Sequence, residues 1–306
     1  MVEIKTFHSK NDEQNEFIWI NLIRPKKSEF LEFANKYNIP YEFFTDPLDI
    51  DERARIDVEK EVTLCILRIP TRGTTGTSPF ITVPLGIIIM KNVLITVCAI
   101  PTILTKQLHK DIYAKDLSCI NTFFYILRVT ALYYLQYLKD INSQTMIIER
   151  ELQASLKNQE LISLLAAEKS LVYFTTSLRS NEIMLNRLQN FKSIGPYINT
   201  IDFTIDFEDI LIEYRQAIEM ANVYSNILSG MMDAFASIIS NNLNVVMKIL
   251  TSITILLMLP TLVASFYGMN VSLPFQNSPH AFLITIGISI FLSIVSAIIL
   301  IRHNFM

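Results

Sequence analysis

An uncharged stretch dominates the C-terminal part of the chain: from Ile249 to Ile301 there is no Asp, Glu, Lys or Arg. This is too long for one crossing of a bilayer and about right for two helices of ~20 residues each with a connection. The connection contains Pro274, Asn277, Ser278 and Pro279, which favour turns. We therefore expect a hairpin of two transmembrane helices, about 245–267 and about 281–301. A buried hairpin of a large soluble protein is the weaker alternative, because apolar runs of this length are rare there.

The charges that flank the hairpin predict its orientation. Lys248 stands at the start of the first span, Arg302 and His303 follow the second, and the connecting loop has no Lys or Arg. The positive-inside rule then places both termini in the cytoplasm of a multi-pass plasma-membrane protein. The polar residues Met1 to Glu16 contain no apolar signal-peptide segment, so we expect the first ~240 residues to be cytosolic.

The cytosolic part divides into two regions by its periodicity. Residues 1–116 predict an α/β domain with strands and short helices, and residues 117–204 predict a long helical hairpin with apolar residues at every third or fourth position. The expected strands are 17–23, 63–69, 84–90 and 93–99, the last two forming a hairpin that turns at Lys91-Asn92. The expected short helices are 28–38 and 50–58.

A third helical segment, 205–267, contains no strong breaker before the membrane and is expected to run from a stalk into the first span. At ~1.5 Å per residue, such a helix is roughly 90 Å long. An outer loop at 268–280, the second span at 281–301 and a short cytosolic tail at 302–306 complete the chain.

Several function classes find no support in the sequence. A net charge of −3 gives no indication of a nucleic-acid partner. Cys65, Cys98 and Cys119 lack CxxC spacing, so we interpret them as small apolar residues in a reducing compartment. Carboxylates such as Glu208, Asp209 and Glu213 fit solvated helix faces, and no acid/base constellation suggests an enzyme.

Polar and polarisable residues in the first span follow a helical period. They advance in alternating steps of three and four and therefore share one face of the helix: Asn244, Met247, Thr251, Thr254, Met258, Thr261 and Ser265. We call these seven residues the polar row. Hydroxylated residues also pack membrane helices together, and this alternative stays open for each threonine taken alone.

The polar row as a whole favours a water-facing pore lining. A two-helix hairpin cannot enclose a channel, so several copies must surround a common axis, with the first span inside and the apolar second span toward lipid. The sequence therefore predicts a homo-oligomer.

The polar row ends at a Tyr-Gly-Met-Asn turn on the outer side. Gly268 permits a backbone conformation or a close approach that other residues resist, and Asn270 offers a neutral amide oxygen. A ring of such oxygens suits Mg²⁺, a hard cation that gives up its hydration water reluctantly. Neutral ligands hold the hydrated ion weakly enough for it to leave.

With these residues in view, the chain resembles the CorA family of divalent-cation transporters. The likeness covers essentially the whole chain and depends most on Tyr267-Gly268-Met269-Asn270, on the preceding stretch Leu228 to Phe266, and on Trp19-Ile20-Asn21-Leu22. The resemblance implies a funnel-shaped homopentamer that passes Mg²⁺ and often Co²⁺ or Ni²⁺. Its expected protomer has an α+β cytosolic domain of the α/β/α type, a helical stalk and a two-helix transmembrane hairpin.

The resemblance also implies roles for individual residues. Asn270 matches the outer selectivity asparagine, Asn244 a polar ring near the inner mouth, and Met247 with Leu250 a hydrophobic constriction. On the helix Leu250 flanks the polar row beside Thr251, so either residue can face the axis. Asp233 matches an acidic stalk position that binds regulatory Mg²⁺, but the segment 71–84 lacks the acidic partner expected there. The loop 271–280 likewise lacks the acidic residue that many relatives carry, which predicts weaker concentration of cations at the mouth.

Two other functions remain open from the sequence. One is a proton-coupled Zn²⁺ transporter of the related ZntB branch, which usually replaces the methionine of the tetrapeptide, so that Met269 favours Mg²⁺. The other is a membrane-anchored sensor or scaffold whose hairpin only tethers the cytosolic part.

Overall fold

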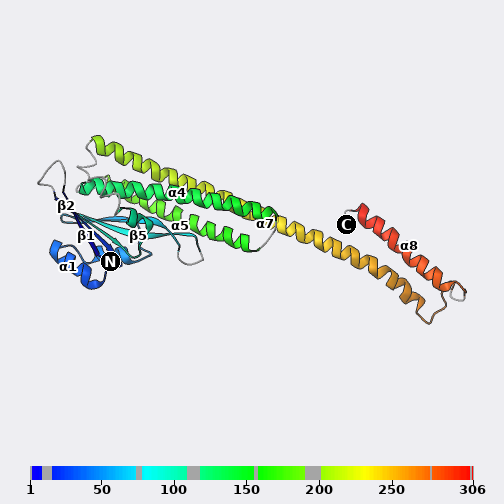
Figure 1. Cartoon of the computed structure of the whole chain (residues 1–306). Coiled ribbons are helices and arrows are strands. Elements are labelled where there is room, and N and C mark those ends of the chain that lie inside the picture. Colours follow the sequence, from blue (N-terminus) through cyan, green and yellow to red (C-terminus); the bar gives the residue numbers. More distant parts are fainter. Residues whose placement is uncertain are drawn as a thin grey trace. The chain divides into compact units, whose positions relative to one another are not determined.

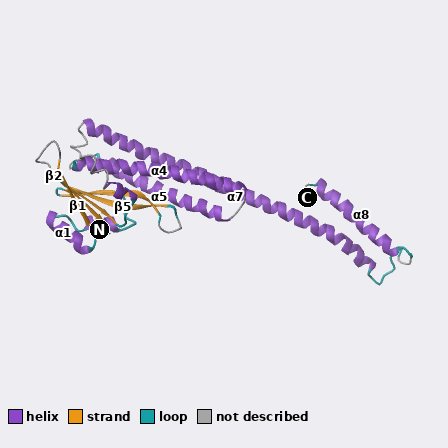
Figure 2. Ribbon diagram, in the orientation of Figure 1, coloured by secondary structure: helices purple, strands orange, loops and turns teal. Residues whose placement is uncertain are grey.

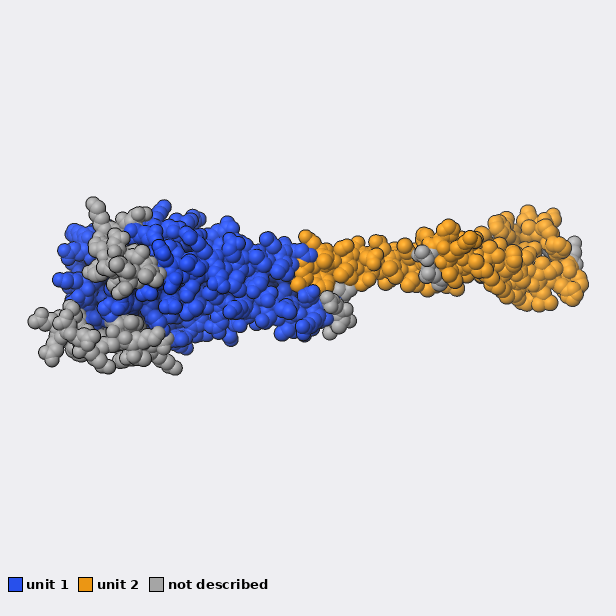
Figure 3. Space-filling model, turned by 90° about the horizontal axis from the view of Figure 1, so that it is seen from above, with its two compact units in different colours: residues 1–230 blue, residues 231–306 orange. Residues whose placement is uncertain are grey.

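The computed structural model describes residues 2–8, 16–73, 78–108, 118–154, 158–189, 201–275, 278–303 and 305. The chain forms two compact units, Met1–Gly230 and Met231–Met306, which are coloured separately in Figure 3. The helix α7 (Ile201–Tyr267) belongs to both, since it begins in the first unit and ends in the second.

The first unit contains a six-stranded sheet in the order β1-β2-β6-β5-β4-β3. Its strands are drawn in orange in Figure 2. Its strands are β1 (Val2–His8), β2 (Glu16–Ile23), β3 (Arg55–Glu59), β4 (Val62–Arg72), β5 (Phe80–Ile89) and β6 (Val93–Cys98). The pairing of β2 with β6 is parallel, and the other neighbours pair antiparallel. β4 and β5 are buried along nearly their whole length, which places helices on both faces of the sheet.

Helices cover the two faces of this sheet as separate layers. On one face, α1 (Lys27–Tyr37) and α2 (Glu42–Thr45) contribute Phe30, Phe33 and Phe44 to a core with apolar residues of the central strands. On the other face lie α4 (Cys119–Ala154) and α5 (Asn158–Leu188), as Figure 1 shows. The arrangement is an α/β/α sandwich, in agreement with the expected class of the cytosolic domain.

Three long helices pack together beside the sheet. The rings of Phe124 in α4 and Phe207 in α7 lie 5.9 Å apart, and the Tyr214 hydroxyl donates to the Leu127 carbonyl at 3.3 Å. Both aromatic residues of α7 are fully buried. The first part of α7 is therefore fixed by a conventional apolar core and not by helix propensity alone.

Most of the expected elements are confirmed, one is wrong, and one strand was not expected. The helix at 28–38, the β5–β6 hairpin and the three long helices are present within a few residues of the expected bounds. The helix expected at 50–58 is wrong, because residues 55–59 form β3, in which Ile56 turns inward between exposed or half-buried polar neighbours. β1 was not expected, because its short alternation of Val2, Glu3, Ile4 and Lys5 lies in a polar N-terminal segment, and its position in the sheet is given by antiparallel pairing with β2. Gly195 and Pro196 predict a connection at 192–204 before the third long helix. Its residues 192–200 lie outside the described residues, and α7 already begins at Ile201.

Three helices among the described residues are long and apolar enough to cross a membrane: Gln159–Leu188 within α5, Asp206–Tyr267 within α7, and α8 (Ala281–Arg302). α5 packs Leu164, Leu171 and Leu178 inward in the first unit. The second part of α7 and α8 expose most of their apolar residues, as expected for helices whose solvent is lipid.

Candidate metal-permeation site

In the two C-terminal helices, the least exposed residues are mainly apolar on α7 and mainly small or hydroxylated on α8. In α7 the buried or half-buried positions of this region are Ser252, Leu256, Leu259, Pro260, Val263 and Tyr267. In α8 they include Ala281, Thr285, Ser289, Ser293, Ser296 and Ala297. The small residues of α8 let the two helices approach closely, and the larger apolar residues of α7 pack against them within the hairpin.

The polar row lies on the other side of α7. All seven of its residues are exposed in the single chain, with Met247 at 52% and Met258 at 64%. At ~100° per residue, the row is about half a turn away from the face that contacts α8. The serines that pack the hairpin and the hydroxyls of the row are thus separate sets, although the sequence pattern contains both.

Two threonine hydroxyls of the polar row donate to their own helix. The Thr254 hydroxyl donates to the Leu250 carbonyl at 2.8 Å, and the Thr261 hydroxyl donates to the Leu257 carbonyl at 3.1 Å. With its hydrogen directed at the backbone, each oxygen keeps lone pairs for an outside donor or cation. The hydroxyl oxygens of Thr254 and Thr261 are therefore available as acceptors on the exposed side of the polar row.

Leu250 is also exposed, at 57%. It lies on the side of the polar row away from Lys248, within about a quarter turn of the row's centre. Leu250 and Thr251 are both exposed in the single chain, so either one can face the common axis of several copies.

At the C-terminal end of α7, the turn is held by backbone and side-chain hydrogen bonds. Gly268 N donates to Ala264 O at 2.9 Å, Met269 N donates to Phe266 O at 3.1 Å, and the Tyr267 hydroxyl donates to Pro274 O at 3.3 Å. Asn270 follows directly and is exposed. The helix end and the tyrosine together fix the position from which the Asn270 amide projects.

The conformational part of the expectation for Gly268 is wrong, because no described glycine has a positive φ. The close approach is present: a Cβ at this position would lie 3.3 Å from the Ala264 carbonyl oxygen. A side chain at Gly268 would therefore crowd the Ala264 carbonyl, whereas a left-handed conformation plays no part here.

Asp233 is an exposed residue of α7. Within the described parts of this chain, no group of three or more His, Cys, Asp or Glu side chains could hold a metal ion. Asp233 therefore belongs to no such group within the described residues.

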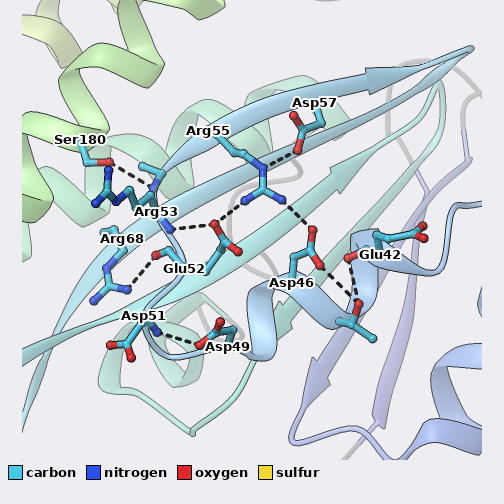
Figure 4. A network of polar contacts seen from close by, with 12 residues as sticks. Glu42, Asp46, Asp49, Asp51, Glu52, Arg53, Arg55, Asp57, Arg68 and Ser180 are labelled. Carbon is cyan, nitrogen blue, oxygen red and sulfur yellow. Dashed lines mark hydrogen bonds and ion pairs between the residues drawn. The ribbon is translucent and has the colours of Figure 1, made fainter.

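A group of carboxylates in the first unit surrounds Arg55 (Figure 4). The guanidinium of Arg55 pairs with Asp46 and Asp57 at 2.6 Å each, and also with Glu52. Nearby, Arg68 donates to the carbonyls of Ile50 and Glu52. These contacts tie the segment before β3 to β4, and no sequence pattern distinguished them from other surface charges.

The three cysteines are buried, as expected of small apolar residues, whereas Glu213 is not on a fully solvated helix face. Cys65, Cys98 and Cys119 are buried, and burial raises the pKa of Cys98 to about 11 and that of Cys119 to about 12, which disfavours the reactive thiolate. Glu213 is not fully solvated as expected: its side chain is 20% exposed, 3.7 Å from Arg128, and burial raises its pKa. Such burial comes from packing of α7 on α4, which the local sequence does not reveal.

Comparison with known proteins gives consistent matches. Residues 14–302 match the protein family described as CorA-like Mg²⁺ transporter protein. A cobalt/magnesium transport protein CorA of Methanocaldococcus jannaschii is 28% identical over 285 residues, which cover 91% of this chain and 88% of that protein. A magnesium transport protein CorA of Helicobacter pylori is 23% identical over 275 residues, 86% of this chain and 82% of that protein.

A solved structure is also similar. The complete structure of the CorA magnesium transporter from Methanocaldococcus jannaschii matches with a TM-score of 0.82 at 27% identity. The match covers 95% of this chain and 92% of that chain, including both compact units.

Proposed function

The chain belongs to the CorA-like Mg²⁺ transporter family, and from this premise we propose that it carries Mg²⁺ across the plasma membrane through a pore lined by the polar row. The exposed polar row on the side of α7 opposite α8 is the observation that carries the proposal. In a lipid environment, such a face is stable only against water or against polar groups of other chains.

The proposed pore is built from several copies, five by the family resemblance. Each copy contributes the second part of α7 to an inner ring and α8 to an outer, lipid-facing ring. Phe282, Leu283 and Phe291 support the outer position of α8, because these large apolar side chains are 65–75% exposed. Lys248 and Arg302 support an orientation with both termini in the cytoplasm.

Within this pore we assign the outer ion-selecting position to Asn270, with Gly268 keeping the turn compact. Asn244, Met247, Leu250, Thr251, Thr254, Met258, Thr261 and Ser265 line the remaining path. A path of neutral oxygens without carboxylates binds a hydrated divalent ion weakly, as conduction requires. Asp233 is proposed as a regulatory ligand only in combination with groups from another copy.

The test is Mg²⁺ influx into proteoliposomes that contain a Mg²⁺-sensitive dye. Asn270→Ala is expected to lower the influx at least tenfold, since it removes the amide that selects the ion; about 1.4 kcal/mol of lost stabilisation suffices for this. Ser272→Ala, an exposed residue of the same loop, is the matched control and should keep the wild-type rate. Equal rates for Asn270→Ala and the wild type would contradict the proposal and favour a tether or scaffold.

Ion competition and a pH gradient separate the proposal from ZntB-type transport. Mg²⁺ influx should follow the membrane potential, be independent of a pH gradient, and be reduced by Co²⁺ or Ni²⁺. Influx of Zn²⁺ that needs a proton gradient would instead indicate the coupled transporter. Met269 and the match to magnesium and cobalt transporters argue against that outcome.

A further inference from the structure

Phe305, near the C-terminus, contacts both helices of the hairpin at the end where α8 terminates. The Phe305 N–H donates to the Leu300 carbonyl at 3.0 Å, and the His303 N–H donates to the Ile299 carbonyl at 3.1 Å. These two bonds cap the last turn of α8 and fix where Phe305 lies relative to that helix. Phe305 is therefore anchored although it stands next to the end of the chain.

Phe305 also contacts α7 at two points. The hydroxyl of Ser252, which is fully buried, donates to the Phe305 carbonyl at 3.2 Å. The Lys248 ammonium lies over the Phe305 ring, 5.8 Å from its centroid, within the range of a cation–π interaction. Lys248 and Ser252 are one helical turn apart, so a single tail residue contacts two successive turns of α7.

Lys248, whose ammonium contacts Phe305, lies on α7 at the border of the polar row. Lys248 directly follows Met247, and on the helix it lies roughly 40–60° from Asn244 and Thr251, at the border of the polar row. Its long side chain is able to reach either the polar row or the side of α8. The Phe305 ring and the Ser252 bond hold it on the side of α8.

The charge matters because the neighbouring path is otherwise uncharged. No Asp, Glu, Lys or Arg occurs from Ile249 to Ile301, so no carboxylate of this segment offsets an ammonium near Met247. An ammonium turned toward the polar row would repel a divalent cation at the inner end, and each copy would add one such charge.

We propose that Phe305 is a positioning residue that keeps the Lys248 ammonium away from the inner end of the ion path. This inference rests on the proposed function, because it assigns the polar row to the path. It predicts that the tail sets the rate of ion passage through charge placement and not merely through hairpin stability.

The test compares Mg²⁺ influx for four full-length variants in proteoliposomes. Phe305→Leu keeps an apolar side chain but removes the π face, and should lower influx at limiting Mg²⁺ roughly two- to fivefold, as expected from the strength of an exposed cation–π contact. Phe305→Leu combined with Lys248→Gln should restore the wild-type rate, since no charge is left to misplace. Phe305→Trp retains the ring and should keep the wild-type rate. Phe291→Leu, the same change at an exposed site in the middle of α8, is the matched control.

Two outcomes would overturn the inference. Wild-type influx in Phe305→Leu would show that the contact does not affect the ion. Influx that stays low when Lys248→Gln is added would show that the tail acts through structure and not through the ammonium.

A second readout does not depend on transport. The rate at which a water-soluble N-hydroxysuccinimide ester acetylates Lys248, followed by mass spectrometry, should rise roughly two- to fivefold in Phe305→Leu. Lys91, an exposed turn residue of the first unit, should react equally in both proteins. If the wild type conducts no Mg²⁺, the proposed function fails, whereas an unchanged acetylation rate of Lys248 contradicts the contact itself.

Discussion

Asn181 is a buried polar residue whose two hydrogen bonds substitute for missing sheet pairing. Its Oδ1 accepts from Arg68 N at 2.9 Å and its Nδ2 donates to Arg68 O at 2.8 Å, beyond the end of β3. The Tyr134 hydroxyl donates to the same carbonyl at 2.9 Å, so Asn181→Ala leaves mainly the Arg68 N–H without a partner.

We expect Asn181→Ala to destabilise the first unit by about 1–3 kcal/mol, the cost of one buried unpaired donor. Its thermal unfolding midpoint should fall by roughly 3–8 °C, measured by circular dichroism on the full chain in detergent. Asn142→Ala on α4 is the matched control, since Asn142 makes only an exposed 3.9 Å contact with Met146. Equal midpoints for both variants would show that the Asn181 bonds are dispensable.

Glu213 predicts a dependence of stability on pH. Burial raises the pKa of its carboxyl, so the folded chain binds this proton more tightly than the unfolded chain. The associated stability is fully present below the unfolded pKa and is lost as pH rises through the folded pKa. Glu213→Gln should therefore have a higher thermal midpoint than the wild type at pH 7–8.

On acidification toward the unfolded pKa of ~4.3, the two midpoints should converge. Glu208→Gln, at an exposed residue earlier in α7, is the control and should not reproduce the gain. A lower midpoint for Glu213→Gln at neutral pH would mean that its pairing with Arg128 outweighs desolvation.

Local and long-range signals explain which residues could be identified from sequence. Asn270 and the polar row are marked by spacing and by their place at the end of a span, which are local properties. Asn181 and Ser252 carry no local signal, because their partners Arg68 and Phe305 are distant in sequence.

At the scale of elements, the second part of α7 should have one wet side and one dry side. Cysteines introduced by Thr254→Cys and Thr261→Cys should react with a charged, membrane-impermeant thiol reagent, whereas Ile294→Cys on α8 should not. The three native cysteines should react slowly with the reagent, because burial raises the pKa of their thiols and limits access to them. Absence of reaction at both threonine positions would indicate dry helix packing and contradict the pore lining.

Local composition predicts some elements of this fold, whereas others depend on partners that are distant in the sequence. α7 and α8 were predictable because an uncharged run of this length has few alternatives in water. The strand β3 was not, since its five residues combine weak alternation with charges that also suit a short helix. Its conformation is decided by pairing with β4 and by the contacts of Arg55.

For the whole molecule, the decisive property is the number of copies. One hairpin exposes the polar row on α7, and neither α8 nor any other element of the second unit covers it. Closing a ring of identical subunits gives every copy the same polar environment, which a single chain cannot provide. Native mass spectrometry of the protein released from detergent is therefore expected to show five times the protomer mass of 35.1 kDa. When each variant is prepared in the same detergent and mildly oxidised, Thr254→Cys should form disulfides between copies, while Ile294→Cys should not. A monomer that still conducts Mg²⁺ would contradict the proposed pore, because two helices cannot surround an ion path.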